Sequence, residues 1–229
     1  MRIELCVFDA YGTLFDVGGA ARKAANEPGR RALAELWPQL AADWRRKQLE
    51  YSWIRAVAGA HADFWTVTCD ALDWALERHR LDGDRDLKGR LRELYLHLPA
   101  YPEVPEMLDA LKAAERKVAI LSNGAPAMLD SAIASAGLRG KFDAVLSVER
   151  VKVFKPHRSV YDLAVETFGV SGERVLFASS NGWDAAAATG YGFDVLWVNR
   201  EGAPVDRLPW RPERQARNLA AVPAYVCRS

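Results

Sequence analysis

The 229 residues of the chain suffice for one large domain or two small ones with a substantial buried core. Half of the residues are apolar, and 31 Lys and Arg side chains nearly balance 30 Asp and Glu, which leaves a formal net charge of +1. This balance provides no electrostatic basis for nucleic acid or an anionic membrane as the main partner.

The cysteines and the apolar segments indicate the cellular compartment in which the protein works. Cys6, Cys69 and Cys227 are odd in number and far apart, which suits a reducing compartment better than a disulfide framework. No stretch approaches the ~20 consecutive apolar residues that span a bilayer. The first residues also lack the basic, apolar and cleavage regions of a signal peptide. We therefore expect a cytoplasmic protein.

Five short apolar runs, rich in β-branched and aromatic residues, predict strands. They begin at Ile3, Lys117, Phe142, Arg174 and Phe193. Stretches with helical periodicity separate the last four runs, and one more precedes the run at Lys117. The expected helices cover 104–115, 126–136, 157–168 and a stretch from 184 onward. Apolar strands that alternate with helices are typical of a parallel sheet covered on both faces. The sequence therefore predicts an α/β fold with a Rossmann-like core.

Glycines after the helical patterns predict where some of these helices end. The positions expected to cap helices at their C-termini are Gly137, Gly169 and Gly190.

The interval between the first and second strands contains no convincing strand pattern. Apolar residues from 33 to 54 recur at helical spacing, and further helices are expected at about 64–79 and 87–98. Pro38 predicts the start of a new helix, because proline is poorly tolerated inside one. We therefore expect a helical cap at 16–97, inserted into an α/β core formed by 1–15 and 98–229. The tail after Trp210 is polar and predicts irregular structure.

Polar side chains follow the predicted strands where a ligand crevice is expected. In an open parallel sheet this crevice forms at the carboxyl ends of the strands. The polar residues at or just after these ends are Asp9, Tyr11, Thr13, Ser122, Asn123, Lys155, Ser180, Asn181 and Asp184. A helical cap inserted after the first strand would close over them.

Five segments in this order carry a family resemblance that covers nearly the whole chain: "DAYGTLFDV", "WRRKQLEYSW", "ILSNGAP", "FKPHRSVY" and "SSNGWDA". Together they resemble the L-2-haloacid dehalogenases of the haloacid dehalogenase superfamily, rather than the phosphatases that make up most of it. The resemblance implies an (S)-2-haloacid dehalogenase, a hydrolase that acts on carbon–halide bonds.

The resemblance also implies roles for the polar residues. Asp9 attacks carbon 2 of a short 2-haloalkanoic acid, expels halide and forms an aspartyl ester, which water then hydrolyses. One displacement inverts the carbon, so an (S)-2-haloacid gives an (R)-2-hydroxyacid. Lys155 keeps Asp9 ionised, since an opposite charge within ~4–6 Å favours the charged form. Thr13 holds Asp9 in position. The candidates for placing and activating the water are Ser180, Asn181 and Asp184, the last also a candidate partner of Lys155.

Substrate contacts follow from the same resemblance. Arg45 receives the leaving halide with help from Asn123. Ser122, with backbone N–H groups after the first strand, holds the substrate carboxylate. The residues expected to form the wall of the substrate pocket are Tyr11, Leu49, Phe64, Tyr161 and Trp183. Arg46 stands where the family often has Gln, which leaves the preferred chain length open.

Tyr11 favours dehalogenation for a chemical reason. In the superfamily's phosphatases, an acid at this position protonates the departing alkoxide, whereas a halide leaves without a proton. The resemblance further implies no metal and no cofactor, and it favours a homodimer. A magnesium-dependent phosphatase stays as the alternative, because Asp9 and Asp184 could form part of a magnesium site. A non-catalytic protein that binds small acids is a third hypothesis.

Overall fold

The structure is a computed structural model that describes residues 3–226, so Cys227 lies outside the described part. Within that part, six strands form one sheet in the order β3-β2-β1-β4-β5-β6, and every neighbouring pair is parallel. The strands are β1 (Leu5–Phe8), β2 (Lys117–Ser122), β3 (Ala144–Ser147), β4 (Val175–Ser179), β5 (Asp194–Val198) and β6 (Arg214–Ala216). The first five lie within the predicted apolar runs, and the predicted α/β fold is confirmed.

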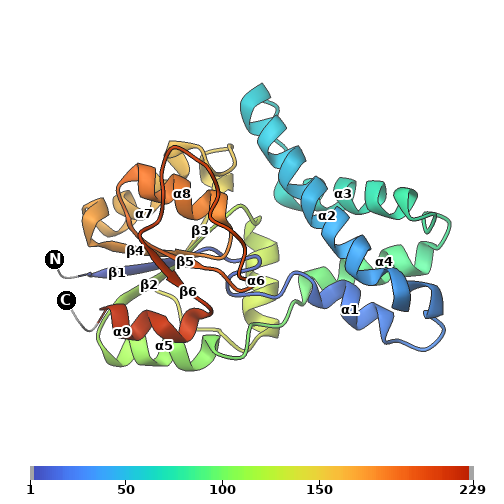
Figure 1. The fold of residues 1–229 in the computed structure, drawn as a ribbon, viewed down its shortest axis with the longest axis horizontal. Coiled ribbons are helices and arrows are strands. Elements are labelled where there is room, and N and C mark those ends of the chain that lie inside the picture. The colour runs from blue at the N-terminus through green and yellow to red at the C-terminus, as the bar shows by residue number, and fades with distance from the viewer. Residues whose placement is uncertain (1–2, 227–229) are drawn as a thin grey trace.

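Helices cover both faces of the sheet, as Figure 1 shows. α7 (Arg158–Phe168) and α8 (Gly182–Tyr191) lie over one face, and α5 (Val104–Ala113) and α9 (Val222–Val226) lie over the other. α6 (Pro126–Ser135) packs beside β3. Short 3-10 turns at 148–150, 172–174 and 219–221 join these elements. Since both faces are covered, the central strands β1 and β4 are completely buried.

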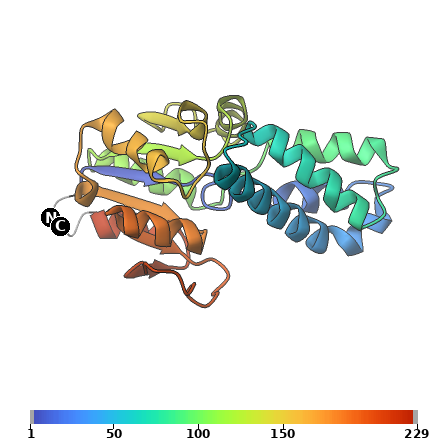
Figure 2. The ribbon, with the colours of Figure 1, turned by 90° about the horizontal axis from the view of Figure 1, so that it is seen from above.

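Four further helices form a separate helical part beyond the carboxyl ends of the strands, far from both termini (Figures 1 and 2). They are α1 (Gly19–Ala25), α2 (Arg31–Ala58), α3 (Phe64–Arg78) and α4 (Arg85–Leu96). α2 packs against α1 and α3, and α1 packs against α4. The sequence pattern did not predict α1, whose seven residues GAARKAA contain no large apolar side chain.

The predicted helix start at Pro38 is wrong. α2 runs without a break from Arg31 to Ala58 and contains Pro38. Proline removes one N–H group, so the carbonyl group of Ala34 loses its partner in the helix. Pro38 and Ala34 are both exposed, and water can therefore bond to that carbonyl group. One long helix can thus span the helical part.

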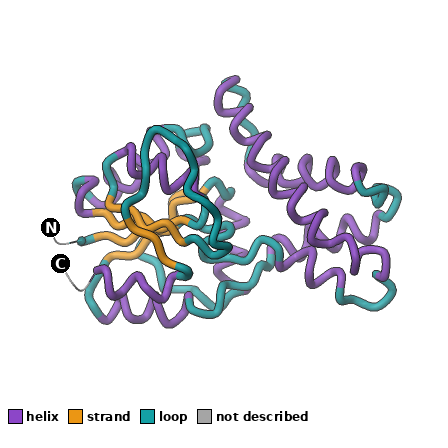
Figure 3. The backbone as a smooth tube through the Cα atoms, viewed as in Figure 1, coloured by secondary structure: helices purple, strands orange, loops and turns teal. Residues whose placement is uncertain are grey.

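The expectation of an irregular tail is also wrong. After a loop that arches over the molecule (Figure 3), the chain adds β6 to the sheet edge and then forms α9. Leu196 of β5 pairs with Arg214, and the Arg214 guanidinium lies 3.0 Å from the Asp194 carboxylate. Pairing of backbone groups at a sheet edge does not require apolar side chains, so the polar composition concealed this strand.

The glycines at the helix ends divide into two cases. Gly137 and Gly169 have φ of 69° and 64°, which is the left-handed conformation expected of a cap. Gly190 was wrongly assigned, because α8 continues to Tyr191 and ends at Gly192. A Cβ atom on Gly190 would come within 2.2 Å of the Trp210 ring. Gly190 therefore allows the loop to pack closely on α8.

Among residues 3–226, none of the helices combines the length and the apolar character that crossing a membrane requires.

Candidate active site

Asp9 directly follows β1 and lies at the centre of a cluster of hydrogen bonds. Its backbone N–H donates to the Ala178 carbonyl oxygen at 3.0 Å, which continues the pairing of β1 with β4. Its side chain is nearly buried, and Oδ2 accepts hydrogen bonds from Thr13 Oγ1 at 2.9 Å and Asn181 Nδ2 at 2.8 Å. Lys155 Nζ lies 3.2 Å from Oδ1. Three donors from three chain segments therefore fix the orientation of this carboxylate.

The turn after β1 brings Thr13 back onto Asp9. Gly12 makes this possible with a φ of 89°, and a Cβ atom there would lie 3.3 Å from Ser180 Oγ. Thr13 Oγ1 also accepts the backbone N–H of Ser180 at 2.8 Å. The N–H groups of residues 12–15 donate to carbonyl oxygens within the turn. Those four N–H groups stabilise the turn, although the sequence placed the substrate carboxylate on N–H groups of this region.

Lys155 joins two buried carboxylates. Its ammonium nitrogen lies 2.8 Å from Asp184 Oδ2 as well as 3.2 Å from Asp9 Oδ1. Burial by itself would lower the pKa of Lys155, but the charges of Asp184 and Asp9 outweigh it and raise this pKa above its ordinary value. Lys155 is therefore protonated at neutral pH and supplies a positive charge between the two acids.

Asp184 has a second partner, the hydroxyl of a residue that the sequence predicted for the pocket wall. The Tyr161 hydroxyl donates to Asp184 Oδ1 at 2.7 Å, and both side chains are buried. Its hydroxyl fixes the carboxylate that pairs with Lys155, a role that the sequence did not predict for Tyr161. Burial raises the pKa of Asp184, and the charge of Lys155 opposes that rise. Burial also holds the pKa of Tyr161 well above its ordinary range, so the phenol stays a donor.

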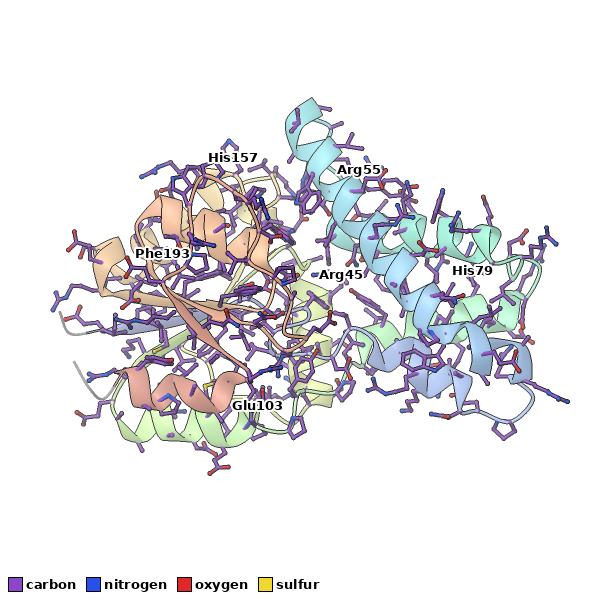
Figure 4. All side chains as sticks on the ribbon, viewed as in Figure 1. Arg45, Arg55, His79, Glu103, His157 and Phe193 are labelled. Carbon is purple, nitrogen blue, oxygen red and sulfur yellow. The ribbon has the colours of Figure 1, made fainter. Side chains whose placement is uncertain are left out.

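Arg45 reaches the cluster from the helical part (Figure 4). Its guanidinium donates to Gln48 Oε1 at 2.7 Å, to Asn181 Oδ1 at 3.2 Å and to the Tyr11 carbonyl oxygen at 3.3 Å. Asn181 thus accepts from Arg45 and donates to Asp9, which connects the two charged groups through one amide. The formal charges of Arg45 and Lys155 balance those of Asp9 and Asp184.

The two polar residues at the end of β2 are both buried. Ser122 is completely buried, and its Oγ accepts the Gly124 N–H at 3.0 Å. Asn123 Oδ1 accepts the backbone N–H of Lys155 at 2.9 Å. Asn123 therefore anchors the lysine backbone, and only its amide nitrogen is left to approach a ligand.

Aromatic side chains form a wall beside Asp9. The Tyr11 ring stacks on Tyr95 with centroids 5.7 Å apart, and it contacts Phe64 at 5.6 Å. The Tyr11 hydroxyl oxygen is buried and has no hydrogen-bond partner among the described residues. Burial holds the pKa of Tyr11 well above its ordinary range, so this hydroxyl group is neutral. Leu49 lies one helical turn after Arg45 and is partly buried.

Two hollows adjoin the cluster. A cavity of about 300 Å³ lies beside the hydrogen-bonded cluster, and its lining includes Gly12, Arg45, Ser180, Asn181 and Arg200. An apolar groove of about 560 Å³ lies between the end of α2 and α8, and its lining includes Trp53, Val57, Phe154, Trp183 and Trp210. Trp183 contacts Trp53 edge to face, with centroids 5.4 Å apart, so it belongs to the wall of this groove.

The sequence pattern missed Gln48 and Tyr95, which contact the predicted residues directly. Gln48 follows Arg45 by three positions, and residues three apart lie on the same face of a helix. The helical spacing could therefore have predicted that Gln48 neighbours Arg45. Tyr95 lies in α4, outside every segment that carried the resemblance, and no local signal marked it. Among residues 3–226, no group of three or more His, Cys, Asp or Glu side chains is arranged to hold a metal ion.

The chain is similar in sequence to a family of hydrolases and to several known dehalogenases. The model of the haloacid dehalogenase-like hydrolase family matches residues 3–192. (S)-2-haloacid dehalogenase 1 of Pseudomonas sp. strain CBS-3 is 42% identical over 227 residues, which cover 99% of this chain and 97% of that protein. (S)-2-haloacid dehalogenase 4A of Burkholderia cepacia is 43% identical over 88% of this chain and 85% of its own length.

A solved structure gives the same result in three dimensions. The L-2-haloacid dehalogenase of Xanthobacter autotrophicus, with chloropropionic acid covalently bound, superimposes with a TM-score of 0.87. It is 38% identical to this chain, and the match covers 99% of both chains.

Proposed function

The chain belongs to the haloacid dehalogenase-like hydrolase family, and from this we propose that it is an (S)-2-haloacid dehalogenase that converts short 2-haloalkanoic acids to (R)-2-hydroxyacids. The observation that carries the proposal is the buried Asp9 carboxylate, which three donors hold beside the guanidinium of Arg45. We assign the α/β core to 1–15 and 98–229, and the cap to 16–97.

The first step is a displacement at carbon 2 of the substrate. Asp9 Oδ1 is the proposed attacking oxygen, because Oδ2 already accepts two hydrogen bonds. A bond forms between Oδ1 and carbon 2, and the carbon–halogen bond breaks with its electron pair on the halide. Arg45 stabilises the charge that develops on the halide, with the amide nitrogen of Asn123 as a second donor. The product is an ester between Asp9 and the substrate, inverted at carbon 2.

The second step is hydrolysis of that ester. Water attacks the carboxyl carbon of Asp9, and the resulting oxyanion on Oδ2 is stabilised by its donors Thr13 and Asn181. We assign the placing of the water to Ser180 and Asn181. Asp184 accepts its proton, since burial raises the pKa of this carboxyl and makes it a better base. The bond between the carboxyl carbon and Oδ1 breaks, Asp184 returns the proton to Oδ1, and the hydroxyacid leaves with an oxygen from Asp9. The second proton of the water passes to solvent, which leaves Asp9 as a carboxylate again.

The other proposed roles concern binding. Ser122 holds the substrate carboxylate. The wall that faces the substrate carbon chain is assigned to Tyr11, Leu49, Phe64 and Trp183.

The charges of the site need no metal ion or cofactor in this mechanism. A magnesium-dependent phosphatase would require oxygens of Asp9 and Asp184 as metal ligands. The Lys155 ammonium group contacts one oxygen of each carboxylate, at 3.2 and 2.8 Å. Tyr11 also stands where a phosphatase needs an acid for its leaving group. The tyrosine in place of an acid at position 11 favours dehalogenation over phosphate ester hydrolysis.

A single turnover in 18O-labelled water tests the mechanism. With enzyme in excess over 2-chloropropionate, the label is expected in the Asp9 carboxylate, detected as a mass shift of the peptide that contains Asp9. Label found only in the 2-hydroxypropionate would mean that water attacks the substrate directly. If the enzyme released no halide and instead hydrolysed a phosphate ester in a reaction that a chelator stops, the phosphatase would be favoured.

We also propose a homodimer that works in the cytoplasm. The end of α2 supports the dimer, because Val57 is 92% exposed and lies with Trp53 beside the apolar groove. Burial of this surface against a second copy would remove apolar area from water. Light scattering of the native chain is expected to give twice the monomer mass, and Val57→Asp to give the monomer. The wide separation of the cysteines supports the reducing compartment.

A further inference from the structure

Gln48 is a buried polar side chain whose hydrogen-bonding capacity is used almost entirely. It lies in α2 and is only 1% exposed. Its Oε1 accepts from Arg45 Nη1 at 2.7 Å and lies 3.3 Å from the Tyr95 hydroxyl. Its Nε2 donates to Thr68 Oγ1 at 2.7 Å and to the Tyr95 hydroxyl oxygen at 3.0 Å. The amide therefore joins α2, α3 and α4 at one point.

The orientation of this amide follows from counting protons. The Thr68 hydroxyl has one proton, and it donates that proton to the Phe64 carbonyl oxygen at 2.6 Å. Thr68 Oγ1 must therefore accept from Gln48, so the NH₂ group of Gln48 faces Thr68. The amide oxygen is then left to face Arg45. The helical part thus presents a fixed acceptor to the guanidinium group.

The contact with Gln48 is the shortest of the three that hold the Arg45 guanidinium. This contact is 2.7 Å, whereas those with Asn181 and the Tyr11 carbonyl oxygen are 3.2 and 3.3 Å. A long arginine side chain loses much rotamer freedom when it is held in one place. A buried partner that is itself fixed reduces the number of positions that the guanidinium can take.

We propose that Gln48 is a positioning residue that holds the guanidinium of Arg45 where the leaving halide is received. This inference rests on the proposed dehalogenase function and adds to it a residue that does not touch the substrate. Gln48 acts through Arg45, and Asn181 then carries the same alignment to the Asp9 carboxylate. The path Thr68, Gln48, Arg45, Asn181, Asp9 couples the cap to the nucleophile by hydrogen bonds alone.

The test compares two leaving groups in the full-length chain. Gln48→Met keeps an unbranched side chain of similar length but removes the acceptor for Arg45. Chloride is a poorer leaving group than bromide and needs more stabilisation of its developing charge. We expect kcat/KM for 2-chloropropionate to fall about tenfold, less than the ~10²–10³-fold loss of a direct stabilising donor. For 2-bromopropionate we expect a fall of about threefold or less.

The parameter kcat/KM isolates the relevant step. It reports on the reaction up to the first irreversible event, which is cleavage of the carbon–halogen bond, and so it excludes ester hydrolysis. A second readout is product inhibition. The inhibition constant for bromide should rise about tenfold, because a displaced guanidinium binds halide less well.

Two control variants separate positioning from structural support. Ser52 lies one turn after Gln48, is completely buried and donates to the Gln48 carbonyl oxygen at 2.7 Å. Ser52→Ala should lower stability without changing the chloride-to-bromide ratio or the inhibition by bromide. Gln39→Met makes the same substitution on the exposed side of α2 and should change nothing.

Gln48→Asn covers the case in which Gln48→Met does not fold. It keeps the amide but withdraws the oxygen from Arg45, and it should shift the chloride-to-bromide ratio in the same direction. An unchanged ratio and unchanged bromide inhibition in a folded Gln48 variant would overturn the positioning role while leaving the dehalogenase function intact. A wild-type chain that releases no halide from either acid would overturn both.

Discussion

The Lys155 ammonium nitrogen lies 2.8 Å from Asp184 Oδ2, and neither side chain is accessible to solvent. Two ions leave water at a large cost, which their attraction offsets only while both are present. The same ammonium group contacts Asp9, so loss of the cation would leave two buried acids unpaired. Stability and the proposed catalysis therefore depend on the same nitrogen atom.

Replacement of Lys155 should consequently destabilise the fold as well as abolish activity. We expect Lys155→Met to lower the free energy of unfolding by about 3–5 kcal/mol, measured by guanidinium denaturation. The double variant Lys155→Met/Asp184→Asn should regain part of that stability, because one buried charge is removed, but no activity. Lys23→Met, at an exposed position of α1, should match the wild type. A Lys155→Met protein as stable as the wild type would contradict the buried ion-pair argument.

Replacement of the nucleophile should separate activity from folding. Asp9→Asn keeps the shape of the side chain but makes it a very poor nucleophile, and we expect kcat to fall by about 10⁴-fold or more. The circular dichroism spectrum should stay that of the wild type. Asp130→Asn, on the exposed side of α6, is the matched control. Mass spectrometry of the variant should accompany the assay, because an amide hydrolysed back to Asp would restore activity. Turnover by verified Asp9→Asn protein would contradict the covalent mechanism.

Removal of the Tyr11 hydroxyl, which has no hydrogen-bond partner among the described residues, should stabilise the protein. A buried polar atom without a partner costs about 1–3 kcal/mol, so its removal should not destabilise the protein. We expect Tyr11→Phe to raise the free energy of unfolding by about 1 kcal/mol and to raise Tm correspondingly. If the hydroxyl contacts the substrate, kcat/KM should fall in the same variant. Destabilisation by Tyr11→Phe would show that the hydroxyl has a partner in solution.

The N-terminus of α3 should make a contribution to stability that depends on pH. Asp63 accepts hydrogen bonds from the backbone N–H groups of Trp65 and Thr66 at 2.9 and 3.1 Å. Burial alone would raise the pKa of Asp63, but these hydrogen bonds and that of the Thr66 hydroxyl lower it below its ordinary value. Its contribution is therefore fully present above the pKa of the unfolded chain, and is lost as pH falls through the native pKa.

Substitutions at Asp63 test this directly. At neutral pH, Asp63→Ala should cost about 1 kcal/mol, the usual loss for an N-cap, in urea denaturation. The difference from the wild type should shrink as the pH falls through the acid range. Asp63→Asn caps the helix without titrating at this side chain, so it should retain most of the stability at neutral pH. A cost of Asp63→Ala that does not vary with pH would contradict the assignment.

The main architecture could be predicted because it depends on local patterns. Short apolar runs predicted β1 to β5, since strands buried on both faces must be apolar along their whole length. Parallel strands end at a common edge, so Asp9, Ser122 and Asn181 could be expected near one another. The lysine contact to Asp9 followed from the family resemblance, because nothing local places Lys155 there.

Other features depended on tertiary packing. β6 joins the sheet through backbone hydrogen bonds, which its polar side chains do not reveal. Pro38 is tolerated because α2 exposes that turn to solvent. Tyr161 was assigned to the pocket wall because the motif gave its position along α7 but not the direction of its hydroxyl, which Asp184 accepts.

The sequence by itself determined the fold class, because hydrophobic periodicity acts over a few residues, and its short motifs gave the positions of the proposed nucleophile and of the charged groups around it. Only the tertiary structure decided how the charges are held. Gln48 contacts Thr68, 20 positions away, and Tyr95, 47 positions away, and the packing of three helices sets those distances. A hydrogen bond requires placement within a few tenths of an ångström, and no spacing along the chain specifies that.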